Sequence, residues 1–339
     1  MIEVSGLTKY YGVHTAIRDL NFTIERGHIY GFLGPNGAGK TTTMNIVTGC
    51  LAATSGNVKI GGFDIFEDAK KAKKLLGYLP EQPPVYPDMT PYEYLDFVAA
   101  AKGVDRSETE AQKKQVSELT QITDVKDRLI RNLSKGYRQR VGIAQALIGS
   151  PEVIILDEPT VGLDPKQITE MRELIKSLGK EHTVILSSHI LSEVRAVCDH
   201  VMIISHGSLA ASDTPENLES YFTGSTTVKL KVKAPEDKIK SALEKIDACS
   251  GVKFAEDVSG LTDVSLSVKD NADIREAVFF AFSAAGLPIL EMNTVKASLE
   301  DVFIELTAEK PENEAEPGDN RESAAPDGKK EVNADESDI

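Results

Sequence analysis

The chain has 339 residues, of which 41% are hydrophobic and 27% are charged, so it has the composition of a globular protein and the length of two domains. The formal net charge is −15, and the sequence shows no basic stripe that could follow a phosphate backbone, so no nucleic acid is expected as a partner. The three cysteines are far apart and form no CxxC pair, which argues against a disulfide framework or a zinc site and fits a reducing compartment.

The first 220 residues have the pattern of an α/β domain. Short apolar runs alternate with helical patterns, and such runs are typical of strands that are covered on both faces in a parallel sheet. Between about residues 90 and 150 the periodicity is helical, which predicts a helical subdomain inserted into the sheet domain. The apolar runs that predict strands are 29–33, 153–156, 183–186 and 201–204.

Residues 225–307 have the pattern of a second, smaller domain. Two alternating runs, 228–232 and 264–268, predict half-buried strands, and helical spacing follows each of them. The resulting order β-α-β-β-α-β-α matches a ferredoxin-like α+β unit, which we interpret as a dimerisation or regulatory domain. The longest apolar stretch, about 277–290, is shorter than the roughly 20 residues that cross a bilayer, so it predicts a helix and a strand.

Residues 308–339 carry eleven acidic and four basic side chains. They contain no aromatic residue and only two large aliphatic residues, Val332 and Ile339. Because such a segment cannot bury enough apolar surface to offset the entropy of the chain, the sequence predicts a disordered acidic tail.

The run Gly-Pro-Asn-Gly-Ala-Gly-Lys-Thr at residues 34–41 has the GxxxxGK[ST] spacing of a P-loop. It follows the predicted strand 29–33 and should lead into a helix near Gly39, so that bound phosphates lie at a helix N-terminus. Glycines let backbone N–H groups converge on phosphate oxygens, Lys40 would reach the β- and γ-phosphates, and the Thr41 hydroxyl would bind Mg²⁺. The predicted ATP-binding residues here are Gly34, Pro35, Asn36, Gly37, Ala38, Gly39, Lys40, Thr41 and Thr42.

The predicted strand 153–156 ends in Asp157, Glu158 and Pro159. An apolar strand followed by two acidic residues is the pattern of a Walker B element, although it also occurs at ordinary exposed strand ends. Its position in a chain with a P-loop favours the functional interpretation. Asp157 would then hold Mg²⁺, and Glu158 would polarise the attacking water as a general base or an orienting group.

A third motif, Leu-Ser-Lys-Gly-Tyr-Arg-Gln-Arg at residues 133–140, resembles the signature motif of ABC-type ATPases. Four further residues match motifs of that family in the expected order, although each alone would be an ordinary packing or loop residue. Tyr11 resembles the residue that stacks on adenine, and Gln82 resembles the Q-loop glutamine. Asp164 resembles the D-loop aspartate, and His189 resembles the switch histidine.

Seven motif elements in a fixed order, over residues 1 to about 220, identify the chain as a member of this family. The resemblance implies that ATP on the P-loop of one subunit is capped by the signature motif of another, so Ser134, Gly136 and Asp164 are expected among the ATP-binding residues. The implied catalytic residues are Glu158, His189 and Gln82, and the implied Mg²⁺ ligands are Thr41, Gln82 and Asp157.

The signature motif departs from the usual family pattern at Lys135, where glycine is usual, and at Tyr137, where glutamine is usual. Ser134 and Gly136 still supply a hydroxyl group and a close-approach glycine. ABC-2-type exporter ATPases of the drug-resistance and gliding-motility-like groups have such variants, so the resemblance favours an exporter. The remaining histidines, His14 among them, lie outside all of these motifs and are not expected in the site.

The resemblance implies an ATP-hydrolysing subunit that powers export of an unidentified substrate through a separate membrane permease. It would act as a homodimer or heterodimer, in the cytoplasm on the inner face of the cell membrane, with the Pro- and aromatic-rich segment 83–95 at the permease. The alternative is a soluble ABC-type ATPase switch in translation or DNA repair, but such relatives usually have two ATPase domains, a coiled-coil insert or basic surfaces. A module that only binds nucleotide is a third interpretation, which the presence of Glu158 disfavours.

Overall fold

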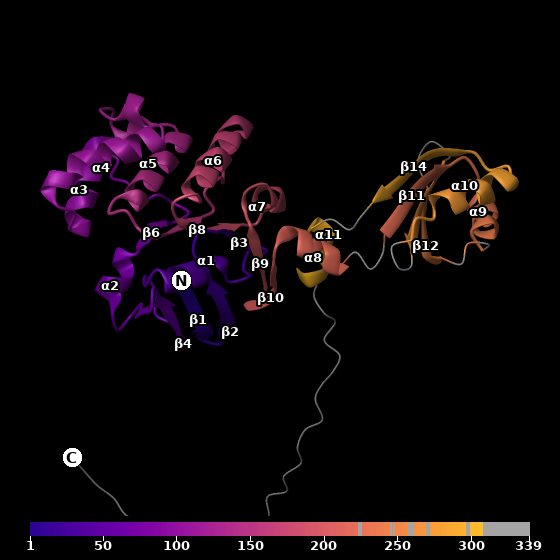
Figure 1. The fold of residues 1–339 in the computed structure, drawn as a ribbon, viewed down its shortest axis with the longest axis horizontal. Helices are drawn as coiled ribbons and strands as arrows, with labels where there is room; N and C mark the ends of the chain where they lie inside the picture. The colour runs from indigo at the N-terminus through magenta and orange to yellow at the C-terminus, as the bar shows by residue number, and fades with distance from the viewer. Residues whose placement is uncertain are drawn as a thin grey trace, which may run out of the picture. The chain divides into compact units, whose positions relative to one another are not determined.

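The computed structural model describes residues 1–222, 226–244, 246, 248–256, 261–268, 272–295 and 299–307 (Figure 1). The predicted tail, 308–339, and the predicted start of the second domain at residue 225 lie outside these residues. The strands are β1 (Ile2–Tyr11), β2 (His14–Ile24), β3 (Ile29–Leu33), β4 (Ser55–Ile60), β5 (Phe63–Asp64), β6 (Leu76–Leu79), β7 (Val153–Asp157), β8 (Thr183–Ser188), β9 (His200–Ser205), β10 (Ser208–Asp213), β11 (Thr226–Val232), β12 (Cys249–Glu256), β13 (Thr262–Val268) and β14 (Ile289–Val295). The α-helices are α1 (Lys40–Val47), α2 (Ala69–Lys74), α3 (Pro91–Lys102), α4 (Arg106–Leu119), α5 (Lys135–Leu147), α6 (Pro165–Leu178), α7 (Leu191–Val197), α8 (Pro215–Phe222), α9 (Glu236–Leu243), α10 (Arg275–Ala284) and α11 (Leu299–Thr307).

The main sheet has six strands in the order β10-β9-β3-β8-β7-β6. All neighbouring pairs from β9 to β6 are parallel, and the edge strand β10 runs antiparallel to β9. Every residue of β3, β7 and β8 is buried, because helices cover one face of the sheet and a second sheet covers the other. The continuous apolar runs therefore form strands of a parallel sheet, and the α/β prediction for the first 220 residues is confirmed.

The second sheet, β2-β1-β4-β5, is antiparallel, and the sequence patterns do not predict it. Its inner residues, such as Ile2 and Val4, pack with Phe32 of β3 and Met44 of α1. The pairing of β1 with β2 is irregular between Val4 and Tyr10. Such bulges interrupt the period of two that identifies a half-buried strand in a sequence, so the pattern is hidden.

The segment between β6 and β7 is helical, with α3, α4, α5 and two short 3-10 turns, Thr123–Val125 and Ile130–Asn132. Thr90 and Glu93 form a capping box at the start of α3, and the Asp105 side chain caps α4. The apolar faces of these helices belong to the core on the helix-covered face of the main sheet.

A third sheet lies between α8 and α11 in the chain, with the strand order β12-β13-β11-β14 and antiparallel neighbours throughout. Helices α9 and α10 pack against it through Ile239, Val278 and Phe282. The apolar stretch near residues 277–290 is divided between α10 and β14, as the sequence predicts. Among the described residues, no helix is both long and apolar enough to cross a lipid bilayer.

The last described helix, α11, contacts α8, β9 and β10 (Figure 1). Its residues Leu299 and Val302 are fully buried, and they share a core with Leu218 of α8 and Val201 of β9. The apolar face of α11 therefore completes the core beside the main sheet, although the sequence groups this helix with the second domain.

Candidate functional site

The loop between β3 and α1 packs closely against its neighbours at two glycines. A Cβ atom on Gly34 would lie 2.5 Å from the carbonyl oxygen of Ile204 in β9. Gly39 has a φ angle of 103°, and a Cβ atom there would lie 2.6 Å from the carbonyl oxygen of Ala16 in β2. A side chain at either position would push the loop away from the strands that support it, so the two glycines determine its path.

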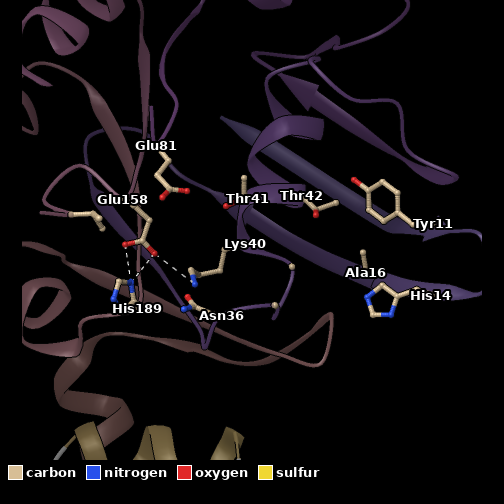
Figure 2. Close-up of a pocket in the computed structure, with 13 residues that line it drawn as sticks. Tyr11, His14, Ala16, Asn36, Lys40, Thr41, Thr42, Glu81, Glu158 and His189 are labelled. Atoms are coloured by element: carbon tan, nitrogen blue, oxygen red, sulfur yellow. Dashed lines mark hydrogen bonds and ion pairs between the residues drawn. The ribbon is translucent and has the colours of Figure 1, made fainter. Parts of the chain in front are cut away.

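A pocket of about 560 Å³ lies beside this loop (Figure 2). Its walls come from the segments that follow β3, β6, β7 and β8, whose carboxyl ends meet at one edge of the main sheet, and from β1 and β2. The lining residues are Tyr11, His14, Ala16, Asn36, Gly37, Gly39, Lys40, Thr41, Thr42, Glu81, Glu158, Val161 and His189.

Lys40 is the first residue of α1, and its side chain is only 6% exposed. Its Nζ atom donates hydrogen bonds to the carbonyl oxygens of Gly34 (2.8 Å) and Pro35 (3.3 Å) and lies 3.7 Å from Oε1 of Glu158. Burial lowers the pKa of Lys40, and the negative charges of Glu158 and Asp157 oppose this change. The ammonium group is thus held at the N-terminus of a helix, where phosphate oxygens are favoured.

Asp157 is the last residue of β7, and the residue is 1% exposed. Its Oδ1 atom accepts a hydrogen bond from the hydroxyl of Ser187, the residue opposite it in β8, whereas its buried Oδ2 atom has no hydrogen-bond partner in the part of the chain that the structure describes. Burial raises the pKa of Asp157, although the hydroxyls of Ser187 and Thr41 and the charge of Lys40 lower it. An unpaired carboxylate oxygen beside the hydroxyl of Thr41 is an oxygen donor set that fits Mg²⁺.

Glu158 follows β7 with a φ angle of 48°, in the left-handed region that side chains rarely adopt. Its backbone N–H donates to Oγ of Ser187 at 3.0 Å, which fixes this conformation. The carboxylate oxygens of Glu158 lie 3.0 and 3.1 Å from Nδ1 of His189, which follows β8 (Figure 2). The Glu158 side chain is 9% exposed and that of His189 is 42% exposed, so the pair joins a buried carboxylate to an imidazole that reaches the pocket.

The pocket contains most of the residues that the sequence motifs predict within one chain. Gly34, Pro35 and Ala38 do not line it, but they complete the loop whose other members do. The predicted residues on the wall are Tyr11, Asn36, Gly37, Gly39, Lys40, Thr41, Thr42, Glu158 and His189.

Two other predicted groups lie away from this wall. Gln82 is exposed on the loop after β6, and the neighbouring residue, Glu81, lines the pocket instead. Ser134 and Asp164 are the N-caps of α5 and α6, and Gly136 is buried in the first turn of α5. Within one chain the signature segment and the D-loop therefore do not contribute to the pocket.

The sequence motifs do not single out His14, Ala16, Glu81 or Val161, which also line the pocket. His14, expected outside the site, reaches it because β2 runs beside the P-loop. This contact depends on the pairing of strands that the sequence does not predict. Glu81 and Val161 adjoin motif residues, and a local pattern does not show which neighbour faces the pocket.

The two unusual residues of the signature motif have defined contacts. The Nζ atom of Lys135 lies against Gly162, since a Cβ atom on that glycine would lie 2.3 Å from it. The Tyr137 hydroxyl donates a hydrogen bond of 2.7 Å to the carboxylate of Asp124, which raises the pKa of Tyr137. Lys135 therefore links α5 to the D-loop, and Tyr137 links α5 to the 3-10 turn of the helical region.

Comparisons with known proteins show the family to which this chain is similar. The sequence model of the ABC transporter family matches residues 17–161. The linearmycin resistance ATP-binding protein LnrL of Bacillus subtilis (strain 168) is 30% identical over 308 residues, which cover 91% of this chain and 98% of that protein. The bacitracin transport ATP-binding protein BcrA of Bacillus licheniformis is 42% identical over 214 residues, which cover 62% of this chain and 68% of that protein. A solved structure of an ATP binding subunit of an ABC transporter superimposes with a TM-score of 0.60 at 29% identity, over 66% of this chain and 93% of that chain.

Proposed function

This chain belongs to the ATP-binding subunits of ABC transporters, and we propose that it hydrolyses ATP to power export through a separate membrane permease of the ABC-2 type. The observation that carries the proposal is the contact of Glu158 with both Lys40 (3.7 Å) and His189 (3.0 Å) in one pocket. A phosphate-binding loop alone would serve any nucleotide-binding protein. A buried carboxylate beside it, held by a histidine, adds the group that hydrolysis requires.

The residues of the pocket divide into a binding set and a hydrolytic set. Lys40 and the backbone of its loop would bind the β- and γ-phosphates, and Tyr11, which is 50% exposed, would stack on adenine. The Thr41 hydroxyl and the unpaired oxygen of Asp157 would hold Mg²⁺, which neutralises charge on the phosphate oxygens when it is bound.

Glu158 would orient the attacking water and accept its proton, and His189 would keep the carboxylate in place. The Glu158 carboxylate lies 3.7 Å from the Lys40 ammonium that would bind the γ-phosphate, so a water between them and the phosphate could pass its proton to Glu158. The exposed position of Gln82 gives no direct support to its predicted role at Mg²⁺ and at the attacking water. That role stays a prediction.

Two copies of the chain would complete the site. Ser134, Gly136 and Asp164 do not line the pocket of their own chain, so they are free to cap ATP bound to a partner copy. The partner would be identical in a homodimer and a related subunit in a heterodimer. ATP would then be the link between the copies, and its cleavage would remove the contacts of the γ-phosphate.

Substitution of Glu158 tests the assignment of hydrolysis. Glu158→Gln is expected to bind MgATP normally but to lower kcat by about 100-fold or more, since the amide cannot accept the proton. The variant should form an ATP-dependent dimer in gel filtration. Glu152→Gln is a matched control, because Glu152 precedes the same strand at its opposite end and pairs with Arg26 on the surface. Wild-type turnover in Glu158→Gln would contradict the proposal.

Substitution of Lys40 tests the binding step separately. Lys40→Ala is expected to abolish ATP binding, measured by calorimetry or with a fluorescent nucleotide analogue. Lys59→Ala provides a control on β4, outside the pocket lining. Unchanged affinity in Lys40→Ala would refute the assignment of the phosphate site.

The permease would contact the segment that follows the Q-loop residue, on the inner face of the cell membrane. Tyr86 and Phe97 are large aromatic residues that are 48% and 46% exposed, and they contact each other edge to face beside α3. Co-purification with a membrane permease in detergent tests this part of the proposal. Co-purification with ribosomes or DNA would instead favour a soluble switch protein.

The third sheet supports a ferredoxin-like domain for dimerisation or regulation. When β11 to β14 are numbered 1 to 4 in chain order, their order in the sheet is 2-3-1-4. Helix α9 connects strands 1 and 2, and helix α10 connects strands 3 and 4. This arrangement corresponds to the split β-α-β pattern. Substitutions of polar residues on this sheet should alter dimer stability or coupling to transport and leave ATP affinity unchanged.

A further inference from the structure

A buried carboxylate lies behind the hydrolytic pair, in the first turn of α7. Both the Thr160 hydroxyl and the Ser188 hydroxyl donate to the same atom, Oε2 of Glu193, at 2.5 Å and 3.3 Å. The Ser188 Oγ atom also accepts a hydrogen bond of 3.0 Å from the backbone N–H of Ile190. One carboxylate oxygen thus joins the segment after β7 to the segment after β8.

The two segments joined by Glu193 are those that carry the hydrolytic pair. Thr160 stands two residues after Glu158, and Ser188 and Ile190 are the residues on either side of His189. The backbone on both sides of His189 is therefore attached, through the Ser188 hydroxyl, to the carboxylate that also holds the Glu158 segment. This network and the direct contact of 3.0 Å between His189 and Glu158 connect the same two segments.

Burial makes this network costly to break. Glu193 is 4% exposed, Thr160 is 4% exposed and Ser188 is fully buried. No lysine or arginine of the described residues forms an ion pair with Glu193, so hydroxyl groups supply its hydrogen bonds. A carboxylate that is removed from water must keep its donors, and this requirement fixes the side-chain positions of Thr160 and Ser188.

We propose that Glu193 is a positioning residue for hydrolysis: it holds His189 and Glu158 in register by joining Thr160 to Ser188. It acts through His189 and does not touch the nucleotide, because it does not line the pocket. The inference rests on the proposed roles of Glu158 and His189. It predicts that loss of the network lowers turnover and leaves nucleotide binding intact.

The test uses Glu193→Gln, Thr160→Val and Ser188→Ala in the full-length chain, with kcat and KM for MgATP measured for each. We expect kcat to fall by about 10–100-fold, because a small displacement of a catalytic pair has effects of this size, while KM stays within about twofold. Thr160→Val and Ser188→Ala keep the test decisive if Glu193→Gln does not fold.

Two controls separate positioning from a general loss of stability. Thr120→Val removes a hydroxyl that is equally buried and donates to Val116 in α4, away from the pocket. It should lower the melting temperature and leave kcat unchanged. Ser192→Ala changes an exposed residue on the same turn of α7 as Glu193 and should change neither quantity.

A double-mutant cycle with His189→Ala provides the readout that a purely structural role would not give. If Glu193 acts through His189, Glu193→Gln should lower kcat by less than about twofold in the His189→Ala background. An equal fall of kcat in both backgrounds would overturn the inference. Normal kcat in Glu193→Gln, with kcat reduced in His189→Ala, would overturn it while leaving the proposed function intact. Normal kcat in His189→Ala would contradict both the role of His189 and the role of Glu193.

Discussion

The carboxyl edge of the main sheet and the signature segment are both parts of the predicted ATP site, but they are built differently. At the sheet edge, Asp157, Glu158 and Ser187 are buried and hydrogen-bonded to one another within one chain. In the signature segment, the exposed Ser134 caps its own helix through a bond of 3.3 Å to the Tyr137 N–H and does not line the pocket.

The difference shows which part of the site is preorganised. A buried network holds its groups in place without a ligand, whereas an exposed helix N-terminus that is only partly capped still has N–H groups that an incoming anion can reach. Substitutions at the sheet edge should therefore alter turnover strongly. Substitutions that touch only the internal contacts of the signature segment should alter it weakly.

The largest effect on stability is expected for Ser187→Ala. The Ser187 hydroxyl donates to Asp157 and accepts the Glu158 N–H, so its loss leaves two buried polar groups without a partner. We expect kcat to fall by about 10–100-fold and the free energy of unfolding to fall by about 1–3 kcal/mol. Steady-state ATPase assays and thermal denaturation measure both. Ser177→Ala, which removes only a bond to Leu174 within α6, is the control, and equal kcat values for the two variants would break the comparison.

An intermediate effect on stability, of opposite sign, is expected for Asp157→Asn. Burial raises the pKa of Asp157, so ionisation of this carboxyl is less favourable in the folded state than in the unfolded state. This cost applies at all pH values above the raised pKa and fades as the pH falls toward the ordinary value of an aspartate. Asp157→Asn should therefore raise the melting temperature at pH 7 by about 2–4 °C without Mg²⁺, while it abolishes turnover.

Melting curves at pH 7 and near pH 4 check the sign of this effect. The difference in melting temperature between Asp157→Asn and the wild type should shrink on acidification. A variant that melts below the wild type at pH 7 would show that the hydrogen bond from Ser187 outweighs the cost of burying the charge.

The smallest effect is expected for Tyr137→Phe. The substitution removes the hydrogen bond of 2.7 Å to Asp124 on the surface of the helical region. The free energy of unfolding should fall by about 0.5–1.5 kcal/mol, and kcat should stay within about twofold of the wild type. A fall in kcat of more than tenfold would show that the position of α5 limits turnover. Turnover would then depend on the signature segment as strongly as on the sheet edge.

The sequence predicts the parts of the site that are contiguous in the chain. Lys40 and Thr41 follow a strand and begin a helix, and Asp157 and Glu158 end a buried strand, so a local pattern is enough to place them. His14 and Glu193 could not be found in this way. His14 reaches the pocket through the irregular pairing of β1 with β2, and Glu193 receives its partners from two strand ends that meet only in the folded sheet.

The orientation of adjacent residues is also beyond a sequence pattern. Gln82 matches the family motif, yet Glu81 lines the pocket, because the conformation of the loop after β6 decides which side chain faces inward. The fold class followed from the apolar runs of a sheet with two covered faces. The antiparallel sheet β2-β1-β4-β5 was missed where bulges interrupt the alternation.

The return of the chain at α11 has a mechanical consequence. Leu299 and Val302 of α11 share a core with β9, and the carbonyl group of Ile204 in β9 lies against Gly34. The polypeptide from β11 to β14 is thus an insertion with both of its ends anchored on the ATPase body. We therefore expect a displacement of α11 to disturb β9, the strand that lies against the P-loop at Gly34.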